Sequence, residues 1–287
     1  MPVTPSPLRY PGGKTALYRM VARIIQDNEL KRCHYVEPYA GGAGLALSLL
    51  FNSYVHEIHL NDIDLSLYAL WDTILNNTEQ LCHLIEKTAI SIENWHKAKA
   101  IQKNKRNATW IELAFSTLFL NRTNRSGIIE GGVIGGLEQS GTYKLDCRFN
   151  KVKLIQKIRR IAKYSHRIHF YNLDAIAFLQ KMRQALPETS FYCIDPPYYA
   201  KGALLYRNAY APKDHKTLAK FLFTLKSPWV LTYDNAPSIQ TLYPQHSQYN
   251  FHLNYSAARK KVATELLIKS NQLYLNNSLA LYPVKTH

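Results

Sequence analysis

CHYVEP (33–38), YAGGAG (39–44), LALSLLF (45–51) and EIHLNDID (57–64) follow one another along the chain and decide the fold class. The first is a short apolar run that ends in an acid and a proline, and the second is a glycine-rich turn. The third opens an apolar helix, and the fourth alternates as a half-buried strand does and ends in acids. Strand, helix and strand in this order form a βαβ unit, which predicts a parallel sheet with its ligand at the carboxyl ends of the strands.

The rest of the chain divides by its periodicity. Residues 67–120 have a helical period, whereas residues 121–150 contain six glycines and little periodicity. This change predicts an irregular loop, and long ordered loops of this kind usually carry function. We therefore expect a doubly wound, mostly parallel α/β sheet with a helical and loop-rich insertion. Later helices are expected at 151–164 and 175–182, and later strands at 167–174, 227–235, 250–255 and 265–270. Residues 190–198 are expected to form a strand that runs into a loop.

Charge is the unusual feature of the composition. Of the 287 residues, 46% are hydrophobic and 20% are charged, which excludes a disordered chain. Lysine and arginine number 36 against 20 acids, so the formal net charge is +16. A folded protein this basic suggests a polyanionic partner, although some proteins are simply basic.

Membrane insertion and export are not expected. The most apolar long stretch, 108–120, is interrupted by Glu112 and is too short to span a bilayer. The N-terminus lacks the apolar segment of a signal peptide. The four cysteines are scattered and the eleven histidines show no metal-binding spacing, so no metal site and no disulfide framework is expected. These features favour a cytoplasmic protein with reduced thiols.

Asp195-Pro196-Pro197-Tyr198 directly follows the apolar run FYCI and is the sharpest motif. Two prolines forbid continuation of the strand, so a rigid loop with outward-facing carbonyls must follow. The Asp195 carboxylate and the Pro196 carbonyl can accept two hydrogen bonds from one NH2 group, and Tyr198 offers a flat face to a planar ring. The alternative is a proline-stiffened turn with an incidental acid.

Methyl transfer to an exocyclic amine suits such a loop. The lone pair of adenine N6 is delocalised into the ring, which makes the nitrogen a poor nucleophile. Two acceptors on its N–H groups favour tetrahedral geometry and free the lone pair for attack on a sulfonium methyl group. A base within a duplex must be flipped out to reach the loop, and Tyr198 would stack on it.

The second motif runs from Glu37 to Gly44, with Asp62 about twenty residues later. Glycines allow the backbone to approach a ligand, and an acid at the end of the next strand can bind ribose hydroxyls. The spacing departs from GxGxxG because Leu47 occupies the third glycine position, and a tight strand-to-helix turn is the alternative.

The third motif, Arg9 to Thr15, ends in GKT. A phosphate-binding loop would need glycine where Leu8 stands, and no apolar strand precedes it. A nucleotide hydrolase is therefore disfavoured, and a mobile basic N-terminus is the alternative.

In this order, Tyr10-Pro-Gly-Gly-Lys14, Glu37-Pro-Tyr-Ala-Gly-Gly-Ala43, the irregular insert and Asp195-Pro-Pro-Tyr198 resemble the Dam-type DNA N6-adenine methyltransferases of the alpha class. One departure is Tyr39-Ala40-Gly41-Gly42-Ala43, where the family often has Phe-x-Gly-x-Gly. The resemblance implies a Rossmann-like methyltransferase fold, with 1–70 and 152–287 as the S-adenosylmethionine-binding catalytic domain and 71–151 as the target-recognition insertion.

The resemblance also implies site residues. Those implied in catalysis are Asp195, Pro196, Pro197 and Tyr198. Those implied in binding S-adenosylmethionine are Tyr10, Gly13, Lys14, Glu37, Pro38, Tyr39, Ala40, Gly41, Gly42, Asp62, Ile63, Asp174 and Asp195.

Contacts to DNA are expected from basic and amide side chains. Arginine suits guanine and asparagine suits adenine, so the start of the irregular loop is expected to read bases, whereas the basic run after residue 258 is expected on phosphates. Solvated turns and charge runs are the alternatives. The expected DNA-binding residues are Arg9, Asn121, Arg122, Asn124, Arg125, Ser126, Arg259, Lys260 and Lys261.

The sequence thus predicts an adenine-specific DNA methyltransferase that acts on double-stranded DNA. We expect a monomer or weak dimer in a restriction-modification, phage or host epigenetic system, with a cognate restriction endonuclease as a partner in the first case. The alternatives are a methyltransferase acting on RNA or a protein amide, and a catalytically silent DNA-binding regulator on the same fold. A dehydrogenase has no support beyond the βαβ unit.

Overall fold

The computed structural model describes residues 4–9, 14–199, 210–255 and 261–284; within these ranges, the side chains of 14–15, 253–255 and 261–263 are not described. The chain forms two compact units. The first unit comprises 1–15, 40–48 and 62–172, and the second comprises 16–39, 49–61 and 173–287. No helix in the described ranges is long and apolar enough to cross a bilayer.

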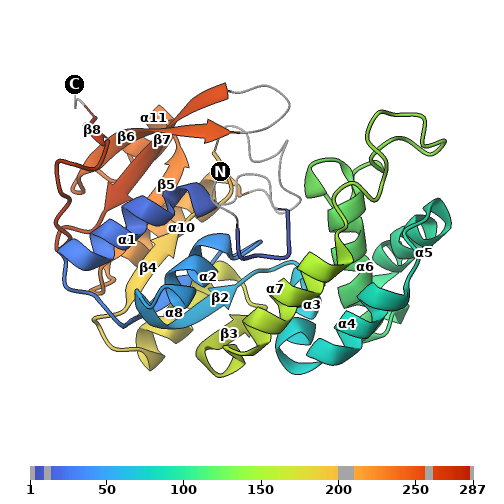
Figure 1. Ribbon diagram of the computed structural model, residues 1–287. Helices are drawn as coiled ribbons and strands as arrows, with labels where there is room; N and C mark the ends of the chain where they lie inside the picture. Colours follow the sequence, from blue (N-terminus) through green and yellow to red (C-terminus); the bar gives the residue numbers. More distant parts are fainter. Residues whose placement is uncertain (1–3, 10–13, 200–209, 256–260, 285–287) are drawn as a thin grey trace. The chain divides into compact units, whose positions relative to one another are not determined.

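Within its described residues, the second unit contains seven strands in the spatial order β2-β1-β4-β5-β7-β6-β8. Figure 1 labels most of them. Strand β1 is parallel to β2 and β4, and β4 is parallel to β5. Strand β7 is antiparallel to both β5 and β6, so β6 runs in the direction of β5. The strands are β1 (Cys33–Glu37), β2 (Val55–Asn61), β4 (Phe191–Ile194), β5 (Trp229–Asp234), β6 (Gln248–Tyr255), β7 (Lys261–Lys269) and β8 (Tyr282–Pro283).

Burial explains why these segments form the centre of a parallel sheet. All four residues of β4 are buried, and so are the first five of β5. Strands covered on both faces need continuous apolar runs rather than alternation. The helices of this unit include α1 (Tyr18–Asp27), α8 (Ala175–Ala185), α10 (Pro212–Phe223) and α11 (Pro237–Gln240). The predicted α/β fold with a mostly parallel sheet is confirmed, and the antiparallel strands β7 and β8 are additions to it.

The first unit is mainly helical. Helix α6 packs against α3 and α5, and α7 packs against α3 and α4. Most of α6 is apolar on all sides, as is typical of a central buried helix, and a capping box between Thr109 and Glu112 starts it. The elements are α3 (Leu65–Asn76), α4 (Thr78–Lys87), α5 (Ile92–Lys103), α6 (Trp110–Thr123), α7 (Lys151–Ala162) and the strand β3 (Ile168–Tyr171). Helix α2 (Gly44–Phe51) has residues in both units.

The irregular segment begins three residues later than expected, because α6 continues to Thr123. From Asn124 to Asn150 the chain contains one short 3-10 turn (Arg125–Gly127) and one isolated bridge, between Asn124 and Val133. The predicted long loop with little regular structure is therefore present in the first unit.

Candidate functional site

The sheet order of the second unit creates a topological switch point between β1 and β4. From β1 the chain continues to β2 on one side, whereas β4 lies on the other side. Ligands of open α/β sheets bind outside the carboxyl ends of strands at such a point. Strand β1 ends at Glu37, and β4 ends directly before Asp195. Because the two strands are parallel neighbours, both acids belong to this edge of the sheet.

Strands β5 and β7 hold the loop that follows β4. Thr232 Oγ1 donates a hydrogen bond of 2.7 Å to Asp195 Oδ1. The backbone N–H of Tyr199 donates to Asp234 Oδ1 at 2.9 Å. The hydroxyl of Tyr198 donates to Glu265 Oε1 at 2.9 Å, and its side chain is 8% exposed. The expected catalytic motif is thus a fixed loop with a half-buried carboxylate.

Glu37 is a buried carboxylate, only 4% exposed. The hydroxyl of Tyr35 donates to its Oε2 at 3.0 Å. Burial, with Cys193 and Glu37 nearby, raises the pKa of Tyr35 well above its ordinary value, so this phenol stays a proton donor. The end of β1 therefore presents a carboxylate whose orientation is fixed by a neighbouring residue of the same strand.

Aromatic side chains surround the same part of the second unit. The hydroxyls of Tyr39 and Tyr210 lie 2.7 Å apart, and the rings of Tyr210 and His215 have centroids 5.3 Å apart. His215 Nδ1 lies 2.7 Å from the Tyr233 hydroxyl. Burial raises the pKa of Tyr210 to about 12 and lowers that of His215, so both rings are uncharged at neutral pH. Uncharged rings suit contact with a planar apolar surface.

In the first unit, Asp62 binds the backbone of the glycine-rich turn. Its Oδ2 accepts from the Gly41 N–H and its Oδ1 from the Asp64 N–H, both at 3.0 Å. Gly41 has φ +47°, a left-handed conformation that glycine adopts without strain, and its carbonyl accepts from Trp71 Nε1. Burial raises the pKa of the Asp62 carboxyl to about 6, although the two N–H groups oppose this. Each carboxylate oxygen keeps a second lone pair, so Asp62 can accept from two vicinal hydroxyls.

The other expected cofactor contacts are placed as follows. Asp174 caps α8, where its Oδ1 accepts from the N–H groups of Ile176 and Ala177. Ile63 is exposed. Tyr10 and Gly13 lie outside the described residues, and the side chain of Lys14 is not described.

Two residues expected to read bases have another role. Asn121 accepts from the Arg9 N–H and donates to the carbonyls of Arg9 and Gly127. Asn124 accepts from Trp95 Nε1 at 2.6 Å and donates to two carbonyls of the irregular loop. Both are buried, and their amides hold the loop. Their expected contact with bases stays a prediction.

Arg125 and Ser126 differ from these asparagines because both are exposed. Ser126 has φ +55°, a left-handed conformation that breaks the helical geometry of this turn. Arg259 and Lys260 lie outside the described residues, and Lys261 begins β7 with a side chain that is not described.

Four cations of the first unit gather without acidic partners. Arg122 Nε donates to the Arg148 carbonyl at 2.6 Å, and Lys157 Nζ donates to the carbonyls of Thr4 and Ser6. Burial, followed by the charges of Arg9 and Arg148, lowers the pKa of Arg122 to about 10. Burial and the charge of Arg122 also lower the pKa of Lys157. We call Arg9, Arg122, Arg148 and Lys157 the cation cluster. Among the described residues, no carboxylate forms an ion pair with it.

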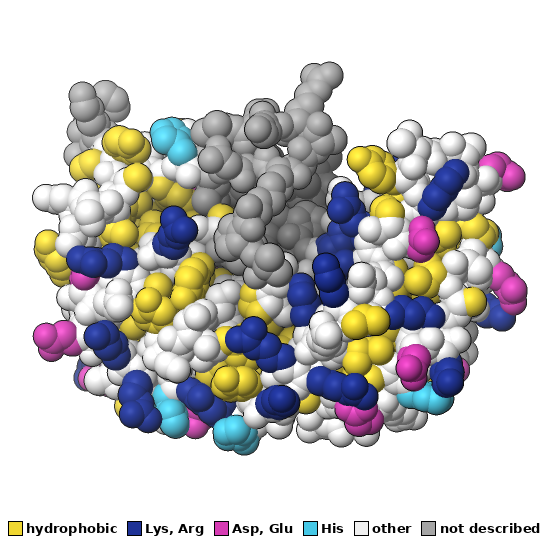
Figure 2. Space-filling view, viewed as in Figure 1, with side chains coloured by type: hydrophobic (Ala, Val, Ile, Leu, Met, Phe, Trp, Pro, Cys, Tyr) yellow, Lys and Arg dark blue, Asp and Glu magenta, His cyan; other side chains and the backbone are white. Residues whose placement is uncertain are grey.

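The cation cluster is an electrostatic cost unless an anion approaches it. Like charges disfavour one another, and burial strengthens this effect because it removes solvent screening. Phosphate groups are the anions that arginine recognises best. Lysine and arginine side chains also outnumber acidic ones on the face shown in Figure 2.

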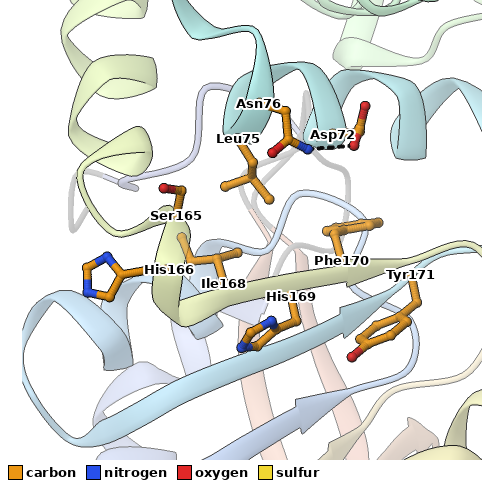
Figure 3. A pocket seen from close by; sticks show the side chains of 9 residues that line it. All are labelled: Asp72, Leu75, Asn76, Ser165, His166, Ile168, His169, Phe170 and Tyr171. Carbon is orange, nitrogen blue, oxygen red and sulfur yellow. Dashed lines mark hydrogen bonds between the residues drawn. The ribbon is translucent and has the colours of Figure 1, made fainter.

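An open groove of the first unit contains none of the expected site residues. It lies between α3 and β3 and is lined by Phe170 (Figure 3). The ring of Phe170 stacks on that of Trp71. At the rim of the groove, Asn76 Nδ2 donates a hydrogen bond to Asp72 Oδ1. Sequence reasoning also missed Thr232, Asp234 and Glu265, which belong to distant segments.

The fold and the loop that follows β4 indicate a class of enzyme, the α/β methyltransferases. Comparison with known families makes the assignment specific. The model of the D12 class N6 adenine-specific DNA methyltransferases matches residues 10–261. The chain therefore belongs to this family, and it is a site-specific adenine DNA methyltransferase. Its substrate is DNA, and methyltransferases of this family generally use S-adenosylmethionine. The resemblance drawn from the motifs is confirmed. A search of curated proteins found no match.

Proposed function

We propose that the protein transfers a methyl group from S-adenosylmethionine to N6 of an adenine that is flipped out of a specific duplex sequence. The observation that carries this proposal is the position of Asp195, next to the switch point and fixed by Thr232. A fixed acceptor raises the rate because it orients the amine before reaction and costs no reorganisation during it.

In this proposal the Asp195 carboxylate and the Pro196 carbonyl each accept a hydrogen bond from one N–H of the amine. The flipped base stacks on Tyr198, whose hydroxyl is held by Glu265. Because the bond to Glu265 fixes the ring, the base meets a surface that is already oriented. Extrusion of the base is required since, within the duplex, the ring is stacked on its neighbours and N6 is paired, so the base cannot reach Asp195 and Tyr198.

The donor set of the chain fits the cofactor. S-adenosylmethionine supplies an electrophilic methyl group when bound. Asp62 has the acceptor capacity for the ribose hydroxyls, and Glu37 is a fixed carboxylate suited to the amino group of the methionine part. We also assign Tyr10, Gly13, Lys14, Asp174 and the turn 38–42 to cofactor binding, on the resemblance alone.

DNA contacts divide into two kinds in the proposal. The cation cluster binds phosphates, because it lacks acidic partners and contains three arginines. Arg125 and Ser126 read bases, since both are exposed on the irregular loop. Arg259, Lys260 and Lys261 add phosphate contacts. Residues 71–151 would then act as the target-recognition insertion of a catalytic domain formed by 1–70 and 152–287.

We place the enzyme in the cytoplasm, bound to DNA as a monomer or weak dimer. It would serve restriction-modification, with a cognate endonuclease, or a phage or host epigenetic system. Long-read mapping of modified adenines in DNA from expressing cells would identify the recognition sequence and hence the system.

The direct test uses purified protein, labelled S-adenosylmethionine and duplex DNA, followed by mass spectrometry of the released nucleosides. The expected product is N6-methyladenine, with Asp195→Ala nearly inactive but still able to bind DNA. A fluorescent adenine analogue at the target should brighten on binding if the base leaves the stack. Label in cytosine, or near-normal activity of Asp195→Ala, would overturn the proposal.

A further inference from the structure

Two neighbouring strands of the second unit bring together side chains that the methyl-transfer reaction does not use. His34 lies on β1, and Glu57 and His59 lie on β2. The parallel register pairs His34 with Glu57. Residues two apart on a strand point to the same face, so His59 lies beside Glu57 on that face. The sheet register therefore fixes all three side chains.

The distances among the three are those of a ligand set. His34 Nδ1 lies 3.1 Å from His59 Nε2 and 3.8 Å from Glu57 Oε2, and His59 Nε2 lies 4.0 Å from the same oxygen. Around a tetrahedral ion with bonds of about 2.0–2.2 Å, two ligand atoms stand roughly 3.3–3.6 Å apart. Small side-chain rotations would thus place one ion at equal distance from all three atoms.

Partial exposure makes the cluster accessible to an ion. The side chains of His34 and Glu57 are 27% and 24% exposed, whereas that of His59 is 7% exposed. An ion could enter from solvent and keep a water as its fourth ligand. His56 Nε2 lies 3.5 Å from the other oxygen of Glu57, where it can orient the carboxylate.

We propose that His34, Glu57 and His59 form a binding site for one divalent transition-metal ion, of which Zn²⁺ is the reference. Two imidazole nitrogens and one carboxylate oxygen suit Zn²⁺ and its neighbours, whereas Mg²⁺ and Ca²⁺ prefer oxygen ligands alone. The bound ion cross-links β1 and β2. We assign the ion a stabilising role, because none of its three ligands is among the residues proposed for cofactor binding or catalysis.

A hydrogen-bonded histidine pair is the competing explanation. A separation of 3.1 Å between two ring nitrogens also fits one N–H donating to a neutral imidazole. The two explanations differ in what they predict for added metal, because only the metal site binds one equivalent through all three side chains.

The test is calorimetric titration of untagged, full-length, chelator-treated protein with Zn²⁺ at pH 7.5, together with native mass spectrometry. We expect one ion per chain and a rise in thermal midpoint on binding. His34→Ala, His59→Ala and Glu57→Gln should each weaken binding more than tenfold, since even outer-shell partners of a ligand change affinity by roughly 10–100-fold. Glu57→Gln keeps the side-chain volume and guards against misfolding of the alanine variants.

The matched control is His166→Ala, which removes an exposed histidine of the first unit. It should bind Zn²⁺ as the wild type does. Cobalt supplies a second readout, because the visible spectrum of Co²⁺ distinguishes four-coordinate from six-coordinate geometry. Absence of one-equivalent binding, or equal binding by wild type and Glu57→Gln, would overturn the metal site and leave the histidine pair. Neither result depends on methylation activity, so the proposed function stands or falls separately.

Discussion

The hydroxyl of Thr232 donates to the carboxylate of Asp195 in the loop that we propose is catalytic. Thr232→Val removes the donor to Asp195 Oδ1 and keeps the shape of the side chain. A hydrogen bond to a charged group contributes about 1.5–3 kcal/mol, so we expect a loss of roughly 10–100-fold in kcat with little change in KM for DNA. Single-turnover kinetics measures this. Thr217→Val is the control, because its hydroxyl bonds only to a carbonyl of its own helix; equal rates for wild type and Thr232→Val would contradict the prediction.

Tyr198 separates ring stacking from the bond to Glu265. Tyr198→Phe keeps the ring and loses the donor, whereas Tyr198→Ala loses both. Base–aromatic stacking contributes about 1–3 kcal/mol per base. We therefore expect partial methylation by the phenylalanine variant and nearly none by the alanine variant, with the fluorescence of a flipped adenine analogue lost only in the latter. Identical activity of the two variants would show that the ring does not hold the base.

Asp62 gives cofactor binding a pH dependence. Because its pKa is about 6, it is ionised above pH 7 and accepts from hydroxyls, and protonation at lower pH removes this capacity. Affinity for S-adenosylmethionine should be flat above pH 7 and fall below pH 6, by up to about tenfold per unit. Calorimetry between pH 5.5 and 8 measures this, with Asp62→Asn weak and nearly independent of pH. Parallel slopes for the two proteins would refute the role.

The raised pKa of Asp62 makes the stability of the fold respond to pH in the opposite direction to cofactor affinity. The ordinary pKa of this carboxyl is 3.8, so the folded protein binds the proton more tightly than the unfolded chain does. Protonation of Asp62 therefore stabilises the fold in the absence of cofactor. This contribution is complete below the ordinary value and is lost as the pH rises through 6. The same carboxylate therefore costs stability at neutral pH and is retained, in our proposal, for the cofactor.

Part of the proposed site could be predicted from residue types alone. Asp195, Glu37 and Asp62 could be proposed from the sequence because each stands at or just after the end of an apolar strand within one local motif. Thr232 and Glu265 could not, since their contacts depend on how β4, β5 and β7 pair, and no local pattern contains that register.

At the scale of elements, apolar runs located the strands better than they located their ends. Strand β7 begins four residues before the expected start at residue 265, because its first residues also pair with β6. The stretch 67–120 divides into four helices, whose ends are set by caps such as Asp64 and Ser91. The sequence did not predict that His34 and His59 meet, for a similar reason. They are 25 residues apart in the chain and come together through the pairing of β1 with β2.

The irregular loop should carry base recognition as an element. Arg125 is exposed at its start, and its planar guanidinium suits two acceptors on a base edge. Arg125→Ala should lose about 1–3 kcal/mol of discrimination at one base pair and leave nonspecific binding nearly unchanged. Affinities for matched and single-mismatch duplexes measure both quantities. A uniform loss on every duplex would instead make Arg125 a phosphate contact.

At the scale of the whole molecule, a net charge of +16 attracts any DNA, so the role of the cation cluster must be separated from bulk charge. Arg148→Ala and Arg159→Ala each lower the net charge by one. Arg148 belongs to the cluster without a carboxylate partner, whereas Arg159 forms two hydrogen bonds with Glu79. Long-range attraction should therefore change equally in both variants.

Local phosphate binding should change only in Arg148→Ala. Each lost phosphate contact reduces the slope of log K against log salt by about 0.9, because one fewer counterion is released. We expect this reduction for Arg148→Ala, the same loss of affinity on specific and nonspecific duplexes, and a wild-type slope for Arg159→Ala. Fluorescence anisotropy across a salt series measures all three. If both variants changed the slope equally, bulk charge would explain DNA binding and the cation cluster would not be the phosphate site. If only Arg148→Ala changed it, binding of DNA phosphates would explain why four cations gather with no carboxylate partner among the described residues.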